Sequence, residues 1–353
     1  MNQDISELLQ QQVLNAIRTS QPLQIQGGGS KQFIGHRSDT TPLDVSGHRG
    51  IVSYDPVELV VTARAGTPLR ELEQTLANEG QILPFEPPHF GLNATLGGTI
   101  ACGLSGPSRS FSGSARDYVL GVKIINGRGE ILNFGGQVMK NVAGYDCSRL
   151  MAGAMGTLGV VLEVSLKVLP KQAAEITLVK KSTLSQALDA MNHWSGKSLP
   201  LSAACYDGEN CYLRLSGAKT AVDSAQQLIG HELHANSDAF WQAVKEHQHP
   251  FFQSELPLWR LSVPAETRAI DIPGTWFIDW CGAQRWLLSN SSAGMIREQT
   301  LAAGGHATLF RRGTVETERF QLPTEGIMQL HRRLKQAFDP AGILNPGQLY
   351  PGL

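Results

Sequence analysis

The sequence predicts an α+β protein of two domains, and three observations point to that class. The chain has 353 residues, roughly enough for two domains of about 150 residues each. Short strand-like apolar runs are interleaved with segments whose apolar residues recur at helical spacing. Glycine is concentrated in residues 91–159, which hold 15 of the 37 glycines, so the backbone there is expected to approach another segment or a ligand closely.

The composition argues against several kinds of partner. The chain has 30 Lys and Arg against 31 Asp and Glu, so it lacks the basic surface that nucleic acids require. The N-terminus shows no leader pattern, and no run of 18 apolar residues occurs. We therefore expect a cytoplasmic protein that reaches a membrane only peripherally, through a partner.

The cysteines and histidines form no pattern typical of a metal site. No Cys-x-x-Cys pair is present, which argues against an iron–sulfur cluster or a structural zinc in this chain. The odd number of cysteines, five, fits a reducing compartment. His247 and His249 form the closest histidine pair, and Pro250 beside them predicts an exposed loop. We expect no bound metal.

The first part of the chain is predicted to be a helix followed by a mixed domain. Residues 1–19 form the N-terminal helix, because their apolar residues recur at helical spacing. Residues 20–170 form the first domain. Its predicted strands are 22–26, 43–45, 58–63, 119–125, 130–132 and 159–169.

Cap and turn signals place two further features in this domain. A helix is expected to begin with Thr67 as its N-cap and Pro68 in its first position, and to end at Gly80. Asn126-Gly127 between two apolar runs predicts a hairpin.

The composition changes after Pro170, and residues 174–312 form a predicted second domain with an antiparallel sheet. Residues 313–353 follow as a C-terminal segment with a helix over 327–338. The second domain is expected to contain helices at 184–194, 221–229 and 295–303, a hairpin at 203–215, and strands at 258–263, 276–280, 285–288 and 306–311.

Residues 27–31, Gly-Gly-Gly-Ser-Lys, follow a predicted strand and are the first candidate ligand site. Successive small residues expose backbone N–H groups that can surround a phosphate, and Lys31 adds one positive charge. The stretch is neither a P-loop nor a Rossmann fingerprint, because the spacing differs and no helix is predicted to follow. A simple glycine turn is the alternative interpretation.

Two further stretches of small residues lie in the same domain. Residues 95–106 follow several prolines, among them Pro88, which stiffen the approach. Residues 153–161 form another tight stretch. The two loops at 27–31 and 95–106 suit a ligand with two phosphates, because many N–H donors hold a diphosphate without many cations. Arg116 is expected to pair locally with Asp117.

Taken in order, these motifs resemble the FAD-linked oxidase superfamily, whose FAD domain is of the vanillyl-alcohol-oxidase and p-cresol-methylhydroxylase (PCMH) type. The resemblance covers nearly the whole chain and rests on residues 27–31, 88, 96–101, 116–121, 156–160 and 338–347. It implies a two-subdomain PCMH-type FAD domain over 20–170, a cap domain over 174–312 that covers the flavin, and a C-terminal segment over 313–353 that returns to the FAD domain.

Residues 102–107 and 138–146 are similar to those of the FAD-binding subunits of bacterial glycolate oxidases. Those enzymes combine two related flavin subunits with an iron–sulfur subunit. The resemblance implies FAD as cofactor and, as partners, a larger homologous flavin subunit and an iron–sulfur subunit. It also implies oxidation of glycolate, a small 2-hydroxy acid, to glyoxylate, with electrons passed onward at the inner face of the membrane.

Two departures from the family pattern bear on the chemistry. Relatives with covalent flavin carry a histidine in the first glycine loop, whereas Ser30 stands here, so we expect non-covalent FAD. Larger catalytic relatives carry a histidine-rich motif late in the cap, where this chain has only His306. The alternatives therefore stay open: a subunit whose flavin takes hydride or only relays electrons, a self-sufficient dehydrogenase of another small 2-hydroxy acid, or a scaffold without flavin.

The resemblance and the glycine pattern together give the candidate site residues. If the chain oxidises a hydroxy acid itself, His306 is the candidate base and Arg311 or Arg312 the candidate partner of the carboxylate. No residue is predicted to bind a metal. The candidate cofactor-binding residues are Gly27, Gly28, Gly29, Ser30, Lys31, Pro88, Leu96, Gly97, Gly98, Thr99, Ala101, Gly106, Asp117, Gly159, Val160 and Asn345, the last of them near the flavin ring.

Overall fold

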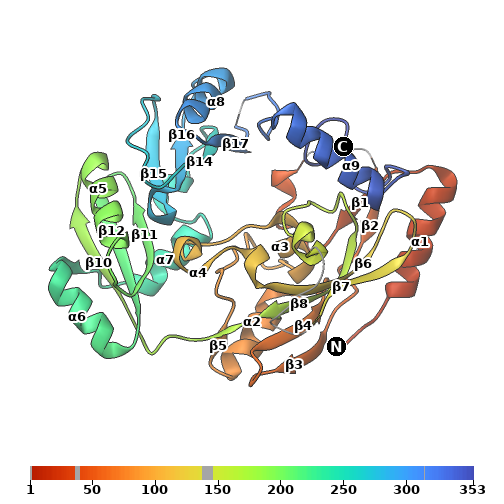
Figure 1. The fold of residues 1–353 in the computed structure, drawn as a ribbon, viewed down its shortest axis with the longest axis horizontal. Coiled ribbons are helices and arrows are strands. Elements are labelled where there is room, and N and C mark those ends of the chain that lie inside the picture. Colours follow the sequence, from red (N-terminus) through yellow and green to blue (C-terminus); the bar gives the residue numbers. More distant parts are fainter. Residues whose placement is uncertain (1, 36–39, 137–145, 314) are drawn as a thin grey trace. The chain divides into compact units, whose positions relative to one another are not determined.

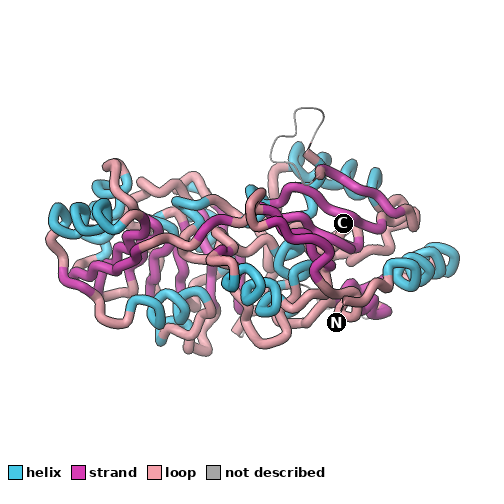
Figure 2. Tube along the Cα trace, turned by 90° about the horizontal axis from the view of Figure 1, so that it is seen from below, coloured by secondary structure: helices cyan, strands magenta, loops and turns pink. Residues whose placement is uncertain are grey.

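The chain divides into two compact units, each with its own group of strands (Figures 1 and 2). The computed structural model describes residues 2–35, 40–136, 146–313 and 315–353. Unit 1 consists of Met1–Ser105, Ser114–Pro170 and Leu322–Leu353, and unit 2 consists of Gly106–Gly113 and Lys171–Gln321.

Unit 1 is built on a five-stranded antiparallel sheet with the order β3-β4-β8-β6-β7. Helix α2 (Leu69–Asn78) buries Leu69, Leu72 and Leu76 in the hydrophobic core that the strands of this sheet also line, as the helical spacing predicts. The hairpin predicted around Asn126-Gly127 is confirmed as β6 and β7. The strands are β3 (Ile51–Asp55), β4 (Val60–Arg64), β6 (Val119–Ile125), β7 (Ile131–Gly135) and β8 (Val160–Lys167).

A second, smaller layer of unit 1 contains parallel strands β1 (Leu23–Gln26) and β2 (Thr41–Asp44). Leu344 of the C-terminal segment extends this sheet by a parallel bridge to Leu23. Helix α1 (Ser6–Thr19) buries apolar side chains in the same cluster as these strands. Unit 1 also contains α3 (Leu96–Cys102), α9 (Glu325–Phe338) and the short pair β5 (Gln81–Ile82) and β9 (Leu169–Pro170).

Two local predictions in unit 1 are wrong. Helix α2 begins at Leu69 with Pro68 as its N-cap, while the Thr67 hydroxyl accepts a hydrogen bond from the Gly50 N–H at 2.9 Å. Residues 96–102 were expected to be a loop but form α3, because Thr95 caps them and the core of unit 1 buries Leu96 and Ile100. Tertiary packing outweighs the poor helix propensity of the glycines there.

Unit 2 contains a single eight-stranded antiparallel sheet with the order β13-β10-β12-β11-β15-β16-β14-β17. Helices α5 and α6 pack on one face of its first half, and α8 packs on one face of its second half. The strands are β10 (Ala174–Lys181), β11 (Leu201–Tyr206), β12 (Asn210–Gly217), β13 (Glu232–Leu233), β14 (Leu258–Ser262), β15 (Thr275–Asp279), β16 (Gln284–Leu288) and β17 (His306–Arg311), and the helices are α4 (Arg109–Ser112), α5 (Leu184–Ser195), α6 (Lys219–Ile229), α7 (Ser237–Lys245) and α8 (Ala293–Ala302).

The region around His247 differs from the exposed loop that the sequence predicted. Helix α7 precedes it, and the His247 ring stacks on Phe252 with a centroid distance of 4.0 Å. Trp286 and Phe310 also contact this ring, so burial lowers the pKa of His247 to about 3 and keeps the imidazole neutral. The histidine is part of an aromatic cluster in unit 2.

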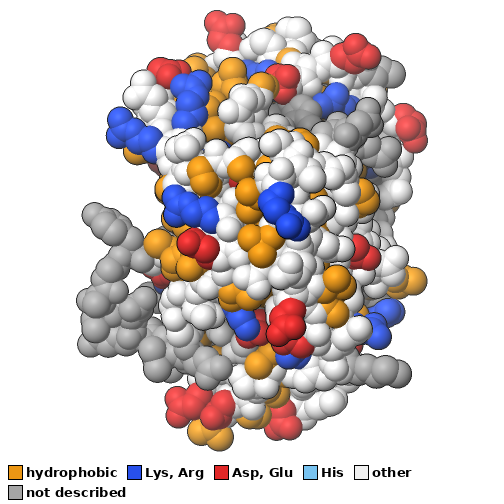
Figure 3. All heavy atoms as spheres, turned by 90° about the vertical axis from the view of Figure 1, so that its right-hand side faces the viewer, with side chains coloured by type: hydrophobic (Ala, Val, Ile, Leu, Met, Phe, Trp, Pro, Cys, Tyr) orange, Lys and Arg blue, Asp and Glu red, His pale blue; other side chains and the backbone are white. Residues whose placement is uncertain are grey.

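The described residues include no helix that combines the length and apolar character needed to cross a bilayer. Charged side chains of both signs are scattered over the face in Figure 3, in keeping with the net charge of −1.

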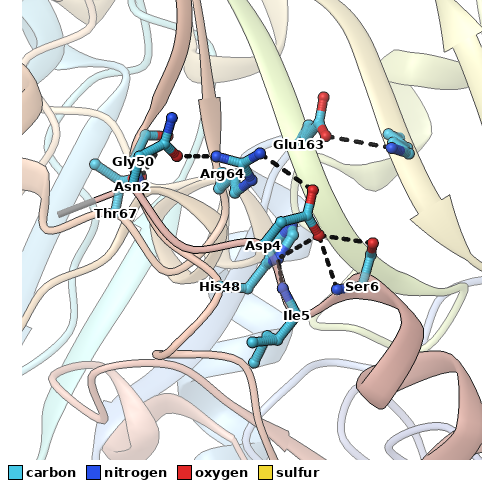
Figure 4. A network of polar contacts seen from close by, with 10 residues as sticks. Asn2, Asp4, Ile5, Ser6, His48, Gly50, Arg64, Thr67 and Glu163 are labelled. Carbon is cyan, nitrogen blue, oxygen red and sulfur yellow. Dashed lines mark hydrogen bonds and ion pairs between the residues drawn. The ribbon is translucent and has the colours of Figure 1, made fainter.

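A polar network ties the N-terminal segment to the rest of unit 1 (Figure 4). Asp4 accepts hydrogen bonds from the Ser6 N–H and hydroxyl at 2.9 and 2.7 Å, and its second oxygen lies 3.1 Å from an Arg64 nitrogen. The buried His48 accepts the Ile5 N–H at its Nδ1 atom, at 3.1 Å. The hydrogen bonds from Ser6 hold the pKa of Asp4 well below its usual range.

This network predicts a pH-dependent contribution to stability. A carboxylate whose pKa is depressed in the folded state stabilises the fold above its unfolded pKa of about 4, and that contribution is lost as the pH falls through the folded value. Asp4 is 44% exposed, so solvent screens the pair, and we expect Asp4→Asn to lower the free energy of unfolding by about 0.5–1 kcal/mol at neutral pH. Thermal unfolding between about pH 6 and pH 3 should show the difference shrinking with acidification.

Asp44→Asn is a suitable control for this experiment, because Asp44 accepts only the Ser46 N–H among the hydrogen bonds described for its carboxylate. Asp44→Asn should lower the free energy of unfolding at neutral pH by less than Asp4→Asn does. A destabilisation by Asp4→Asn that stays constant across the pH range would contradict the role given to the carboxylate.

Candidate functional site

A groove in unit 1 is the main candidate site. It is lined by the end of β1 and the turn after it (24–32), by α3 with its N-cap (95–102), by the loop that leads into β8 (155–161), and by Asn345. Lys31 is the single charged side chain among the described residues that line it. The groove is therefore nearly neutral and is formed largely by backbone and small side chains.

The turn at 27–31 presents backbone donors to this groove. A Cβ on Gly28 would lie 1.3 Å from the Asn93 carbonyl oxygen, and Gly29 has a φ of +73°, so both positions require glycine. Within the described part of the chain, the N–H groups of Gly28, Gly29 and Ser30 have no protein acceptor. Successive N–H groups of one turn that have no protein acceptor are suited to bind an anion.

Lys31 supplies the positive charge next to these donors. It is 6% exposed, and its Nζ atom donates to the His89 carbonyl oxygen at 3.2 Å. Cys102 also lines the groove, and burial raises the pKa of its thiol to about 11 although Lys31 acts in the opposite direction. The thiol is therefore protonated at neutral pH and is a weak nucleophile.

The two glycines of α3 have different roles. The Gly97 N–H already donates to the Ala65 carbonyl oxygen at 2.7 Å, and a Cβ on Gly97 would lie 2.6 Å from the Ala65 Cβ. Gly97 therefore permits close packing of α3 on β4 and does not offer a free donor. A Cβ on Gly98 would meet only the Thr95 hydroxyl, at 3.3 Å, so Gly98 leaves space on the groove side of the helix.

Asn345 joins two walls of the groove. Its side-chain oxygen accepts the Ile25 N–H at 2.6 Å, and its amide nitrogen donates to the Met155 carbonyl oxygen at 2.7 Å. Its φ is +42°, in the left-handed region that asparagine tolerates better than most residues. A Cβ on Gly156 would lie 2.6 Å from this amide, so the loop can approach Asn345 only with glycine there.

The structure brings most, but not all, of the predicted cofactor-binding residues to this groove. Those that line it are Gly27, Gly28, Gly29, Ser30, Lys31, Gly97, Gly98, Ala101, Gly159 and Asn345. Leu96, Thr99, Val160 and Pro88 are buried and are not among the groove-lining residues. Residues 138–145, which contributed to the resemblance, lie outside the described residues.

Gly106 and Asp117 also lie away from the groove lining. Gly106 belongs to unit 2, where its carbonyl oxygen accepts the Trp280 indole N–H at 2.9 Å. Asp117 caps a short 3₁₀ helix by accepting the Ser114 N–H at 2.8 Å, and Arg116 lies 3.9 Å from its carboxylate. Burial acts against ionisation, but the Ser114 bonds hold the pKa of Asp117 below its usual value.

Sequence reasoning missed several residues that line the groove. Val45 and Ala65 line the groove at strand ends, and Gln348 comes from the C-terminal segment. Ala65 follows an apolar strand as a small residue before Gly66, and this pattern could have suggested a close backbone approach.

A second candidate site lies in unit 2, around Trp280. The guanidinium carbons of Arg109 and Arg260 lie 4.4 and 5.2 Å from the centroid of the Trp280 indole ring. The Nε atom of Arg260 donates to Gln284 at 2.7 Å. Burial first, and the neighbouring Arg109 second, lower the pKa of Arg260 to about 10, so its guanidinium group stays charged at neutral pH.

The predicted pair of His306 and Arg311 is not brought together. Both residues lie on β17, five residues apart, which corresponds to roughly 16 Å along a strand and exceeds the reach of a small hydroxy acid. His306 instead lies near Arg260, because Arg260 pairs with Thr308 across the sheet and His306 is two residues further along β17. Desolvation of the ring and the Arg260 charge lower the pKa of His306, which favours the neutral imidazole.

Comparisons with known proteins agree with this architecture. The family described as FAD binding domain matches residues 6–135, and FAD linked oxidases, C-terminal domain, matches residues 321–349. The structure of an alkyldihydroxyacetonephosphate synthase aligns with a TM-score of 0.69 at 18% identity, covering 97% of this chain and 76% of that one. The PCMH-type fold expected from the sequence is confirmed.

Two curated relatives are similar in sequence. "Glycolate oxidase subunit GlcE" of Escherichia coli is 47% identical over 350 residues, which are 99% of each chain. "Glycolate oxidase subunit GlcD" of Bacillus subtilis is 33% identical over 129 residues, which are 36% of this chain and 27% of that protein. The chain therefore belongs to the FAD-linked oxidase family of flavin-dependent oxidoreductases, and its cofactor is FAD.

Proposed function

We propose that this chain is the FAD-bearing subunit of an assembly that oxidises the CH–OH group of glycolate to glyoxylate and passes the electrons onward. The full-length similarity to a glycolate oxidase subunit, at 47% identity over 99% of both chains, is the observation that carries the proposal. A larger homologous flavin subunit and an iron–sulfur subunit are the proposed partners, and contact with a membrane is peripheral, through the assembly.

The groove of unit 1 has features that suit the diphosphate of FAD. The free N–H groups of Gly28, Gly29 and Ser30 would surround one phosphate, with the Lys31 ammonium group close to them. Gly98 leaves space on the groove side of α3, and Asn345 is a side-chain amide of the lining that the flavin would meet. Backbone donors are pre-oriented, so they hold an anion with little reorganisation.

We expect the FAD to be held without a covalent bond. Such a bond needs a nucleophilic side chain at the ring, and Ser30 stands where covalent relatives carry histidine. Among the described residues that line the groove there is no histidine, and the Cys102 thiol has its pKa raised to about 11. Denaturation of the purified protein should therefore release all of the FAD.

FAD supplies a two-electron acceptor for the substrate C–H bond, and the protein supplies binding and proton transfer. A 2-hydroxy acid needs a cation for its carboxylate and a base for its hydroxyl proton. We propose Arg260, assisted by Arg109, as the carboxylate partner in place of Arg311, and His306 as the base. The guanidinium groups of Arg109 and Arg260 both lie close to the Trp280 ring, and two positive charges near one point favour an anion beside them.

The proposal is tested with the purified full-length chain, alone and with its two partner subunits. FAD content and bleaching of the visible flavin absorption by glycolate are measured. We expect a yellow protein that glycolate bleaches only after the partners are added, because Arg260 and His306 are proposed to act in the assembled enzyme. Bleaching of the isolated chain would favour the self-sufficient dehydrogenase, and a colourless chain that cannot be loaded with FAD would refute the proposal.

Substitution of Gly98 tests the cofactor groove. Gly98→Leu places a side chain in the free space of the groove, and we expect the dissociation constant for FAD to rise about 100-fold, because overpacking costs about 3 kcal/mol. Fluorescence titration of the apoprotein with FAD measures the effect. Gly294→Leu is the matched control, since Gly294 lies in α8 with nothing within 4 Å of its Cβ position, and unchanged affinity in Gly98→Leu would disprove the assignment.

Substitution of Arg260 tests the substrate site. Lysine cannot reproduce the two-pronged geometry of a guanidinium group, so Arg260→Lys should raise KM for glycolate about tenfold or more in the assembled enzyme. Arg214→Lys is the control, because Arg214 is a buried arginine of the same unit whose Nε donates to Ser202 at 2.9 Å. An unchanged KM in Arg260→Lys would show that this chain does not bind the substrate there.

A further inference from the structure

A buried lysine lies behind the wall of the groove in unit 1. Lys335, in the last turn of α9, is 9% exposed. Its Nζ atom donates to the Asp339 carboxylate at 2.7 Å, the Leu344 carbonyl oxygen at 2.6 Å and the Thr157 carbonyl oxygen at 2.9 Å. An ammonium group has three N–H donors, so every donor of Lys335 is used within the protein.

The partner carboxylate, Asp339, shapes the chain that follows α9. Its side chain is fully buried, and it accepts the Leu344 N–H at 2.8 Å and the Ile343 N–H at 3.2 Å. These bonds turn the chain back, so that the Leu23 N–H donates to the Ile343 carbonyl oxygen at 2.7 Å. Residues 343–345 consequently lie beside β1.

Lys335 contacts both segments that form this side of the groove. Thr157 belongs to the loop that leads into β8, in which Met155 and Gly156 line the groove. Leu344 immediately precedes Asn345, which also lines it and donates to Met155. One ammonium group therefore fixes the distance between two backbone segments, although Lys335 itself is not among the groove-lining residues.

A requirement for stability alone would not select this pair. Burying an ion pair removes both charges from water, and apolar residues of similar volume often serve a core equally well or better. A cation with three backbone or carboxylate acceptors instead fixes the geometry of the segments that provide them. Here those segments are two walls of the candidate cofactor site.

We propose that Lys335, together with Asp339, is a positioning residue for the cofactor: it holds Asn345 and the loop at 155–159 at the separation that FAD requires, without contacting FAD. This inference rests on the proposed assignment of the groove to FAD. It adds a determinant of affinity and of the flavin environment that lies outside the groove lining.

The test compares FAD binding with the stability of the apoprotein. Lys335→Met alone leaves a buried carboxylate unpaired and can prevent folding, so the double variant K335M/D339N, which removes both charges, is the main one. Lys123→Met is the matched control, since Lys123 forms a partly buried ion pair with Glu163 at 3.3 Å in the same unit and does not line the groove. Fluorescence titration, the visible absorption spectrum of bound FAD and the Tm of the apoprotein are measured for each.

We expect K335M/D339N to raise the dissociation constant for FAD about tenfold and to shift the flavin absorption bands. A tenfold change in affinity lies within the range of coupling energies found between residues of one hydrogen-bond network. Lys123→Met should leave both unchanged, whatever its Tm. If K335M/D339N lowers Tm but binds FAD with wild-type affinity and spectrum, the pair is only structural and the inference is overturned.

A double-mutant cycle with Asn345→Ala tests whether the effect passes through Asn345. Adding K335M/D339N to Asn345→Ala should weaken FAD binding less than it does in the wild-type background, because the group being positioned is gone. Full additivity would contradict the inference. Failure of the groove assignment is recognised separately, because Gly98→Leu would then bind FAD as tightly as the wild type.

Discussion

The groove of unit 1 depends on the close approach of backbone segments at positions where no Cβ fits. A Cβ added to Gly28 would lie 1.3 Å from the Asn93 carbonyl oxygen, and a Cβ added to Gly97 would lie 2.6 Å from the Ala65 Cβ. The glycine at 28 lets the turn after β1 pass close to Asn93, and the glycine at 97 lets α3 pack against Ala65, the residue that follows β4. Any side chain at either point would separate the walls.

Sequence patterns predicted the elements that local signals determine. The apolar spacing of α2 and the Asn-Gly turn between β6 and β7 are both local signals, and the structure confirms both elements. The glycine turn at 27–31 was identified in the same way, because a run of small residues after a strand needs no tertiary information. Sequence patterns did not predict helix α3, because its two glycines favour a loop. The helix is stabilised by burial of Leu96 and Ile100 in the core of unit 1, which no local pattern shows.

The remaining parts of the candidate sites depend on residues distant in sequence. Lys335 donates to Thr157, which is 178 residues away, and no local pattern could relate them. Likewise Arg260 and His306 become neighbours only through the register of β14 and β17, whereas the predicted His306 and Arg311 share one strand and are held apart by its length. Strand pairing within the sheet therefore places Arg260, and not Arg311, near His306.

In the proposed function, the two candidate sites bind anions by different means. The groove uses fixed backbone dipoles and a single lysine, which suits a ligand that is held permanently and needs shape more than charge. The site near Trp280 uses two guanidinium groups on one indole, which suits a small anion that has to be attracted and released. In the proposed function, the first holds the cofactor and the second recognises the substrate.

The order of segments along the chain has a consequence for biosynthesis. Unit 1 is completed only by residues that follow all of unit 2, because Leu344 extends the β1 sheet and Asn345 joins β1 to the loop before β8. A ribosome therefore releases the glycine turn long before the segment that closes the groove around it. If the groove holds FAD as proposed, a nascent chain lacks one wall of the cofactor site until translation has passed Asn345, so flavin capture would be a late event in maturation.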